Sequence, residues 1–447
     1  MTPSARWTIC TCTAAALLAA PGFFPGSSPY TVAIAQAQSA HPSPGAHAKK
    51  PAAAPAASAA AGQPKLPPRT PFSAADDAAA AIPGMPDARF FGDSVADYTK
   101  ALPSQPGPWL ILSTGGEDGA FGAGLLNGLS AAGKRPDYSV VTGVSTGALM
   151  APFAFAGAKY DAALKAAYTA ITAADIFEVG STGESFVDSW PLKDLIAKEI
   201  TPALLADIAA AYQNGRRLFV VTTDLDAERS VIWNMGAIAV HAADKAGGDS
   251  ALNLFRTVLL ASGSIPGAFP PVLIDVEANG KHFQEMHVDG GVGGQFFLAP
   301  PALTASDSGY KIPATQLYIV INAGLQPDFA VVQPSTPSIL AQAVGTAVMV
   351  DLRLMLDRAF VAAKNSGIGF NVATIPAGFS APSRGPFDPD YMKALFNAGF
   401  DQGQSENPFA GAPPLYQNQP ATDPSGAPNL ERGKPATTDG ENPGATK

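Results

Sequence analysis

The stretch that decides the fold is Tyr138-Ser139-Val140-Val141-Thr142-Gly143-Val144-Ser145-Thr146-Gly147, followed by the apolar run 148–156. Residues 138–143 have the composition of a buried strand, and 148–156 predict a helix. Between them, Gly143, Ser145 and Gly147 form a G-x-S-x-G pentapeptide. At a sharp strand-to-helix turn, this spacing projects the serine hydroxyl from the sheet edge, where the helix dipole favours negative charge. Ser145 is therefore a candidate nucleophile, although the pentapeptide alone also fits an ordinary glycine-rich helix start.

The alternation of strands and helices extends in both directions from this turn. Strands are predicted at 109–112, 218–223, 230–233 and 316–322, and helices at 119–131, 160–173, 192–212, 252–261 and 338–363. Strands that are buried on both faces and separated by helices indicate a mainly parallel sheet. We therefore predict an α/β fold, a three-layer α/β/α sandwich with a mainly parallel central sheet.

A second glycine-rich turn lies one strand–helix unit earlier, in Ser113-Thr114-Gly115-Gly116-Glu117-Asp118-Gly119. Glycines in such a turn let backbone N–H groups point at an anion. A nucleotide site is disfavoured, because no Lys-Ser/Thr follows the glycines and the G-x-G-x-x-G spacing is not met. An oxyanion hole beside Ser145 fits better, since neighbouring turns meet at one sheet edge. A tight loop with close helix packing is the alternative.

The third motif is His287-Val288-Asp289-Gly290-Gly291, a carboxylate followed by two glycines at the end of a predicted strand. The glycines indicate a tight turn that fixes the Asp289 carboxylate. A purely structural Asx turn gives the same pattern.

In this order, the three motifs resemble the patatin-like phospholipase family, and residues 261–271 resemble the segment that this family has between its serine and its aspartate. The resemblance covers residues 109–291, with weaker support to 403. It implies a Ser–Asp dyad without a catalytic histidine. Ser145 would be the nucleophile and Asp289 the base. The resemblance further implies that Gly115 and Gly116 supply oxyanion-hole N–H groups, and that the motif glycines are Gly143, Gly147, Gly290 and Gly291.

Two positions depart from the family pattern. Thr114 stands where the three-glycine run begins, which backbone donors tolerate. Asp118 stands where the family often has Arg or Lys, so a cation near the oxyanion hole is replaced by an anion. Because an ordinary aspartate, with a pKa near ~3.9, is a weak base for a hydroxyl, the dyad requires partial desolvation of Asp289.

Other side chains offer alternative chemistries. His241, His282 and His287 follow Ser145 as the histidine of a Ser–His–Asp esterase would. Asp224 and Asp226 end a predicted strand, where a turn is favoured over metal ligation. Because no helix-spaced histidine pair is present, we expect no metal site. We also expect no cofactor.

Composition narrows the class of partner. The chain has 447 residues, of which 47% are hydrophobic and 15% charged, with a net charge of −9. An acidic chain lacks the basic field that nucleic acids require. The resemblance to the patatin-like phospholipases implies a carboxylic ester hydrolase whose partner is a lipid ester substrate at a membrane surface. The open alternatives are a lipid acyltransferase, the Ser–His–Asp esterase, and a non-catalytic lipid-binding protein of the cell envelope.

The ends of the chain differ in composition from the middle. Residues 1–37 have the layout of a secretory signal peptide, with Arg6, an apolar run and the A-x-A pattern Ala35-Gln36-Ala37. A retained membrane anchor is the alternative. Residues 38–86 are predicted to be an extended Ala/Pro-rich linker, 87–403 the acyl hydrolase domain, and 404–447 a disordered tail. The protein is thus expected to be exported, periplasmic or secreted, and both cysteines (Cys10 and Cys12) lie in the segment that cleavage would remove.

Overall fold

The computed structural model describes residues 68–180, 184–243, 248–327, 329 and 331–414. Its main sheet has nine strands; seven follow the order β1-β7-β6-β3-β2-β10-β11, and the β8–β9 hairpin joins at β6. Five neighbouring strands are parallel: β6 (Arg217–Asp224), β3 (Val140–Val144), β2 (Gly107–Leu112), β10 (Ala314–Ile321) and β11 (Gly369–Thr374). The predicted α/β fold with a mainly parallel sheet is confirmed.

Antiparallel strands complete one side of the sheet. β1 (Arg89–Phe91) pairs with β7 (Arg229–Asn234), and β7 pairs with β6. β9 (Lys281–Asp289) pairs with β8 (Val272–Ala278) and, through its last three residues, with the end of β6. Because β6 also neighbours β3, the end of β9 lies beside the strand that carries the G-x-S-x-G turn.

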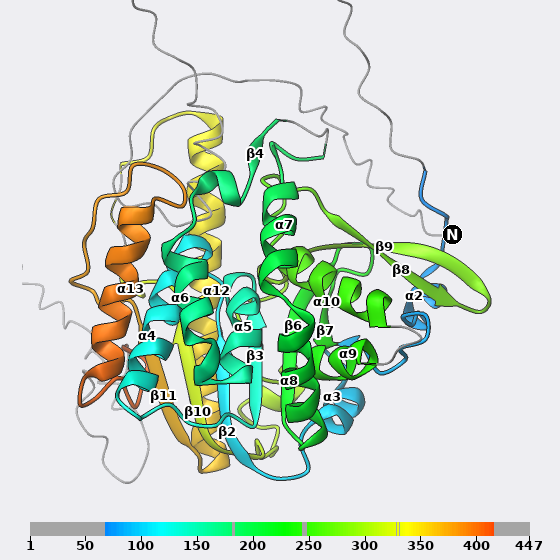
Figure 1. Cartoon of the computed structure of the whole chain (residues 1–447), viewed down its shortest axis with the longest axis horizontal. Helices are drawn as coiled ribbons and strands as arrows, with labels where there is room; N and C mark the ends of the chain where they lie inside the picture. The colour runs from blue at the N-terminus through cyan, green and yellow to red at the C-terminus, as the bar shows by residue number, and fades with distance from the viewer. Residues whose placement is uncertain (1–67, 181–183, 244–247, 328, 330, 415–447) are drawn as a thin grey trace, which may run out of the picture.

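Helices cover both faces of the sheet, which gives the three predicted layers (Figure 1). The larger core packs the following helices on one face: α4 (Gly119–Ala131), α5 (Thr146–Ala156), α6 (Asp161–Thr169), α7 (Trp190–Glu199), α8 (Pro202–Gln213), α9 (Met235–Ala242), α10 (Gly248–Ser262) and α13 (Pro389–Gln404). The smaller core packs α3 (Val95–Ala101) and α12 (Thr336–Ser366) on the other face.

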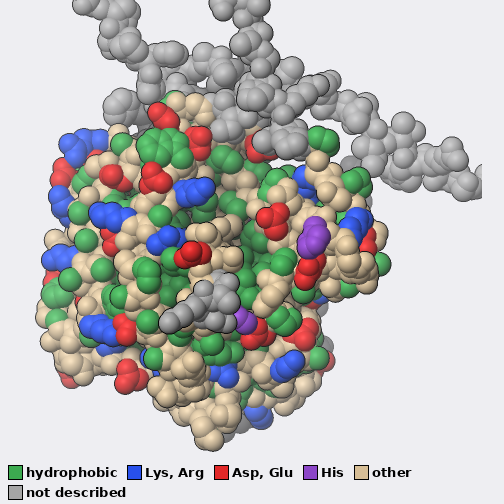
Figure 2. Space-filling view, turned by 45° about the vertical axis from the view of Figure 1, so that its right-hand side comes forward, with side chains coloured by type: hydrophobic (Ala, Val, Ile, Leu, Met, Phe, Trp, Pro, Cys, Tyr) green, Lys and Arg blue, Asp and Glu red, His purple; other side chains and the backbone are tan. Residues whose placement is uncertain are grey.

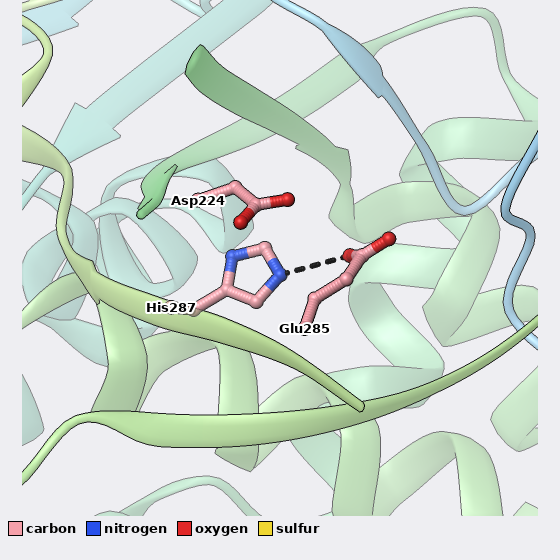
Figure 3. A group of neighbouring side chains, drawn as sticks. All are labelled: Asp224, Glu285 and His287. Carbon is pink, nitrogen blue, oxygen red and sulfur yellow. Dashed lines mark hydrogen bonds and ion pairs between the residues drawn. The ribbon is translucent and has the colours of Figure 1, made fainter. Parts of the chain in front are cut away.

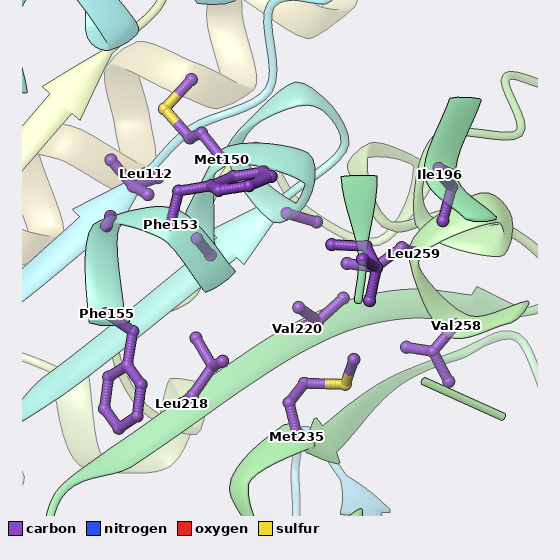
Figure 4. Packing of buried hydrophobic residues seen from close by; sticks show 14 of the residues in the cluster. Leu112, Met150, Phe153, Phe155, Ile196, Leu218, Val220, Met235, Val258 and Leu259 are labelled. Atoms are coloured by element: carbon purple, nitrogen blue, oxygen red, sulfur yellow. The ribbon is translucent and has the colours of Figure 1, made fainter. Parts of the chain in front are cut away.

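Strand alternation assigns side chains to the two cores. In β2, Leu110 and Leu112 belong to the larger core, whereas Trp109 and Ile111 belong to the smaller one. This follows from the two-residue period of a strand, which turns successive side chains to opposite faces. Figure 4 shows the larger core around α5, where Met150, Phe153 and Phe155 lie over the strands. The turns at the strand ends are thereby held between two packed layers.

The helix predicted at 192–212 is two helices. α7 ends at Glu199, and α8 begins with Pro202 after Thr201, whose side chain accepts a hydrogen bond from Leu204 N–H. Proline has no N–H to donate to the preceding turn, so a continuous helix is broken there, whereas proline suits a helix start.

The packed region extends beyond both predicted boundaries. Part of the predicted linker contains α2 (Ala74–Ala78), and Phe72 stacks on Phe283 with ring centroids 4.4 Å apart. At the other end, Ala410 bridges to β11. A few apolar side chains give these alanine- and proline-rich segments enough surface to pack. The predicted signal peptide, residues 38–67 of the linker and residues 415–447 of the tail lie outside the described residues.

Candidate active site

Ser145 lies in the turn between β3 and α5, with the strained backbone that the pentapeptide predicts. Its φ is 57° and its ψ is −124°, a conformation that costs a non-glycine residue about 1–3 kcal/mol. The Ser145 N–H donates to Ser262 Oγ at 3.0 Å, and Ser262 Oγ donates to the Val221 carbonyl at 2.7 Å. The turn also requires small neighbours, because a Cβ added to Gly143 would lie 2.3 Å from the carbonyl oxygen of Gly147.

The structure brings Asp289 to Ser145 from 144 residues away. Ser145 Oγ donates a hydrogen bond of 2.7 Å to Asp289 Oδ2. The other carboxylate oxygen, Oδ1, accepts the N–H of Gly291 at 2.7 Å. A Cβ on Gly290 would lie 2.4 Å from the Val221 carbonyl oxygen, which explains the glycine after the aspartate. Ser145 is 3% exposed and Asp289 is 1% exposed, so the pair is shielded from water.

Burial changes the basicity of Asp289. Loss of water around the carboxylate raises its pKa to about 7, while the hydrogen bonds from Ser145 and Gly291 act in the opposite direction. A carboxylate with this pKa accepts a proton from a hydroxyl more readily than an ordinary aspartate. The desolvation that the sequence analysis required is therefore present.

The loop before α4 presents backbone donors beside the serine. Gly116 has a φ of 57°, and a Cβ on Gly115 would lie 2.4 Å from the carbonyl oxygen of Asn322. Within the described part of the chain, nothing accepts a hydrogen bond from the N–H of Gly115 or Gly116. Gly116 and Ser145 line the same pocket. These N–H groups are thus placed to stabilise a negatively charged oxygen at the serine.

A glutamine that the motifs did not indicate connects the two loops. Gln295 Oε1 accepts a hydrogen bond of 2.7 Å from Thr114 Oγ1, and its Nε2 donates to the Gly291 carbonyl at 2.9 Å. The Thr114 N–H also donates to the Gln295 carbonyl at 2.9 Å. Thr114, which departs from the family's glycine run, therefore ties the glycine-rich loop to the loop after Asp289. In the sequence, only the hydroxyl group of Thr114 indicated that this residue could form such a hydrogen bond.

Asp118 and its neighbour Glu117 fasten the pocket wall. Tyr391 OH donates to Asp118 Oδ1 at 2.6 Å, and the N–H of Phe387 donates to Glu117. Burial raises the pKa of Asp118 to about 6 and, with the nearby Asp118 charge, that of Glu117 to about 7. Asp118 and Glu117 thus hold a segment from the C-terminal part of the chain, and Phe387 of that segment lines the pocket.

An apolar pocket opens from the serine. It runs between α5, α6 and α7, and Glu199 is the only charged residue among those that line it. The lining residues are Gly116, Ser145, Thr146, Leu149, Phe153, Ala167, Tyr168, Ile171, Ile176, Leu192, Leu195, Ile196, Glu199, Ile200, Leu259, Gly263, Ile265, Phe269, Phe387 and Met392. Hydrophobic side chains are also gathered in a hollow on the face of the molecule in Figure 2. Such a lining suits a hydrocarbon chain.

The three histidines make contacts elsewhere. His241 lies 3.2 Å from Asp87, and His282 lies 3.7 Å from Glu277, both at the surface. His287 is buried, and its ring nitrogens contact Thr222 Oγ1 at 2.9 Å and Glu285 Oε2 at 3.2 Å. The Ser145 hydroxyl thus bonds to a carboxylate, and these contacts give no support to a Ser–His–Asp arrangement.

Asp224, Glu285 and His287 form a buried cluster whose ligand-type atoms lie within 4.8 Å of one another (Figure 3). Glu285 is already paired with the Arg89 guanidinium through two hydrogen bonds, one of them 2.7 Å long. Asp224 Oδ1 accepts the N–H of Asp226 at 2.9 Å, which is the expected turn. Glu285 thus already has the Arg89 guanidinium as a cationic partner, whereas Asp224 Oδ2 is buried without a hydrogen-bond partner in the described part of the chain. The cluster lies where the ends of β6 and β9 pair.

Residues 110–302 match the family model described as patatin-like phospholipase. This part of the chain is therefore similar to a patatin-like phospholipase domain. The range contains both loops and both members of the Ser145–Asp289 pair, whereas Phe387 and Met392 of the pocket lie beyond it.

A solved structure is also similar to this chain. VipD from Legionella pneumophila is similar, with 12% sequence identity and a TM-score of 0.35. The match covers 67% of this chain and 66% of that chain, so it spans slightly less than two thirds of VipD. No curated protein matches the sequence.

Proposed function

We propose that this protein is an acyl hydrolase that cleaves lipid carboxylic esters through an acyl-enzyme on Ser145. The observation that carries the proposal is the 2.7 Å hydrogen bond from Ser145 Oγ to the buried Asp289, at one end of an apolar pocket. The match of residues 110–302 to the patatin-like phospholipase model supports a lipid ester as the substrate.

The reaction has two halves. Ser145 Oγ attacks the ester carbonyl carbon while its proton passes to Asp289 Oδ2, and the carbonyl electrons move to the oxygen beside Gly115 and Gly116. When this intermediate collapses, the alcohol leaves with the proton from Asp289 and the acyl group remains on Ser145. Water then attacks the acyl-enzyme by the same route, which releases the fatty acid and restores the serine.

Labelling with a fluorophosphonate probe tests the nucleophile. Wild-type protein should be labelled, Ser145→Ala should not, and Asp289→Asn should be labelled at least a hundredfold more slowly, because the hydroxyl loses its base. Ser308→Ala, at an exposed serine, serves as the matched control. Equal labelling of wild type and Ser145→Ala would reject the mechanism. If the labelling depends on Ser145, hydrolysis of a panel of lipid esters by the wild type would define the substrate.

We also propose that the protein is exported. The basis is the signal-peptide pattern of residues 1–37. Mass spectrometry of the N-terminus after expression in a secreting host should find a chain that begins after Ala37. An intact N-terminus in the membrane fraction would instead indicate the retained anchor.

A further inference from the structure

Helix α12 is longer than the sheet it covers. Its 31 residues span about 46 Å, whereas the eight residues of β10 span about 26 Å. The end of α12 is fixed at the start of β10, because the Ile312 N–H donates to Ser366 Oγ at 3.0 Å. The excess length of about 20 Å therefore extends past the carboxyl ends of the parallel strands, where Ser145 follows β3.

The contacts of α12 mark where it leaves the core. Asp351 lies 3.5 Å from Gln295 Nε2, and Met355 Sδ accepts the Gln295 N–H at 3.3 Å. Gln295 is the residue that ties the glycine-rich loop to the Asp289 loop. From Leu352 onward, α12 places side chains in the smaller core. Residues 336–350 thus extend beyond the level of the catalytic loops, in the upper part of α12 in Figure 1. One side of this part is covered, since Ala341 and Gly345 are buried, and the other side is exposed.

The projecting part of α12 exposes an apolar surface. Residues 329–350 include no charged side chain. The exposed apolar residues, here called the distal surface, are Phe329 (91%), Val331, Val332, Ile339 (55%), Leu340 (58%), Val344 and Val350. Monomeric soluble proteins rarely expose contiguous patches of this kind, and such patches mark partners or membranes. The remainder of α12 carries Asp351, Arg353, Asp357, Arg358 and Lys364, so the absence of charge is confined to the projecting part.

Length and charge select the occupant. α12 as a whole is long and apolar enough to cross a membrane. However, residues 336–350 alone span about 22 Å, less than the ~30 Å hydrocarbon core, and the rest of α12 is committed to the protein core. Residues 329–350 contain no Lys or Arg that could attract anionic headgroups. The surface therefore suits shallow insertion into an uncharged lipid interface.

We infer that the distal surface docks the enzyme on zwitterionic lipid and so presents the Ser145 pocket to the bilayer. The inference rests on the proposed function. The end of the sheet that carries Ser145 and the distal surface lie at the same end of the molecule. Val179 and Trp190, which are 59% and 49% exposed near the start of α7, add apolar side chains close to the pocket wall.

The test uses the full chain with Ser145→Ala, so that binding is measured without hydrolysis. Flotation with phosphatidylcholine vesicles should recover the protein, and adding Ile339→Ser and Leu340→Ser should weaken partitioning about tenfold or more, because two half-exposed side chains lose their transfer into lipid. Raising salt from low to high or adding anionic lipid should leave the partitioning unchanged. Val95→Ser, at a 38% exposed valine of α3, should partition like its parent.

Four outcomes would overturn the inference: partitioning that ignores the double substitution, partitioning that needs anionic lipid, no partitioning at all, or a wild-type dimer in light scattering that the double substitution converts to monomer. Hydrolysis of a soluble short-chain ester separates this proposal from the proposed function. The double variant with Ser145 intact should retain wild-type kcat and KM on that ester. An inactive wild type whose vesicle binding still depends on Ile339 and Leu340 would reject the hydrolase and leave the docking surface standing.

Discussion

Ionisation of Asp289 should set the pH dependence of hydrolysis. With a pKa of about 7, about ten in eleven Asp289 carboxyls are ionised at pH 8 but only about one in eleven at pH 6. The value of kcat/KM should therefore fall about tenfold when the pH is lowered from 8 to 6. An aspartate with the ordinary pKa of 3.8 would be more than about 99% ionised at both pH values. The tenfold fall is thus a direct consequence of burying the base.

The assay is kcat/KM for a short-chain ester below its aggregation limit, measured from pH 5 to pH 9. A monomeric substrate removes the ionisation of lipid headgroups from the profile, and kcat/KM reports groups of the free enzyme. A profile that stays flat above pH 5 would refute the assignment of Asp289 as a desolvated base.

Glu117 requires a control, because burial and the neighbouring Asp118 raise its pKa to about 7 as well. Glu117→Gln keeps the shape of the side chain and removes its titration. The acidic limb should persist in this variant. If the limb disappears while activity remains, the limb belongs to Glu117 and the interpretation of Asp289 is wrong.

The same pKa shift has a consequence for stability. Folded Asp289 binds its proton more tightly than the unfolded chain does, so this contribution is complete below pH 3.8 and is lost as pH rises through about 7. The loss is on the order of 4 kcal/mol. In urea unfolding, the unfolding free energy of the wild type should therefore decrease relative to that of Asp289→Asn as the pH rises from 5 to 8. A constant difference would contradict the raised pKa.

Three further substitutions probe other parts of the site. Gly115→Ala places a Cβ 2.4 Å from the Asn322 carbonyl oxygen, so kcat for ester hydrolysis should drop about 10²–10³-fold; unchanged kcat would mean that this loop is not the oxyanion hole. Arg89→Ala leaves Glu285 buried without its guanidinium partner and should lower the unfolding free energy by about 3–5 kcal/mol in urea titration; a change below about 1 kcal/mol would show that the pair is dispensable. His287→Gln should keep kcat within about threefold while losing about 1–3 kcal/mol of stability, whereas a thousandfold loss of kcat in a folded variant would favour a histidine mechanism.

The sequence determined the local parts of the site, because each depends on a short run of residues. The G-x-S-x-G turn, the glycine pair at 115–116 and the helix at 119–131 follow from strand and helix periods and from positions that admit only small residues. The same periods predicted the parallel sheet. Alanine and proline content misplaced the domain edges, since composition does not reveal that Phe72 stacks on Phe283.

Only the tertiary structure decided which distant groups meet. The antiparallel return of β9 along β6 places Asp289 against Ser145, and the burial that follows raises the pKa of Asp289. Gln295 gains its role from contacts with Thr114 and Gly291 that no local pattern encodes. That α12 extends past the sheet follows from how this helix packs on the strands, which are shorter. Burial, register and overhang are properties of the packed chain, whereas turns and periods are properties of neighbouring residues.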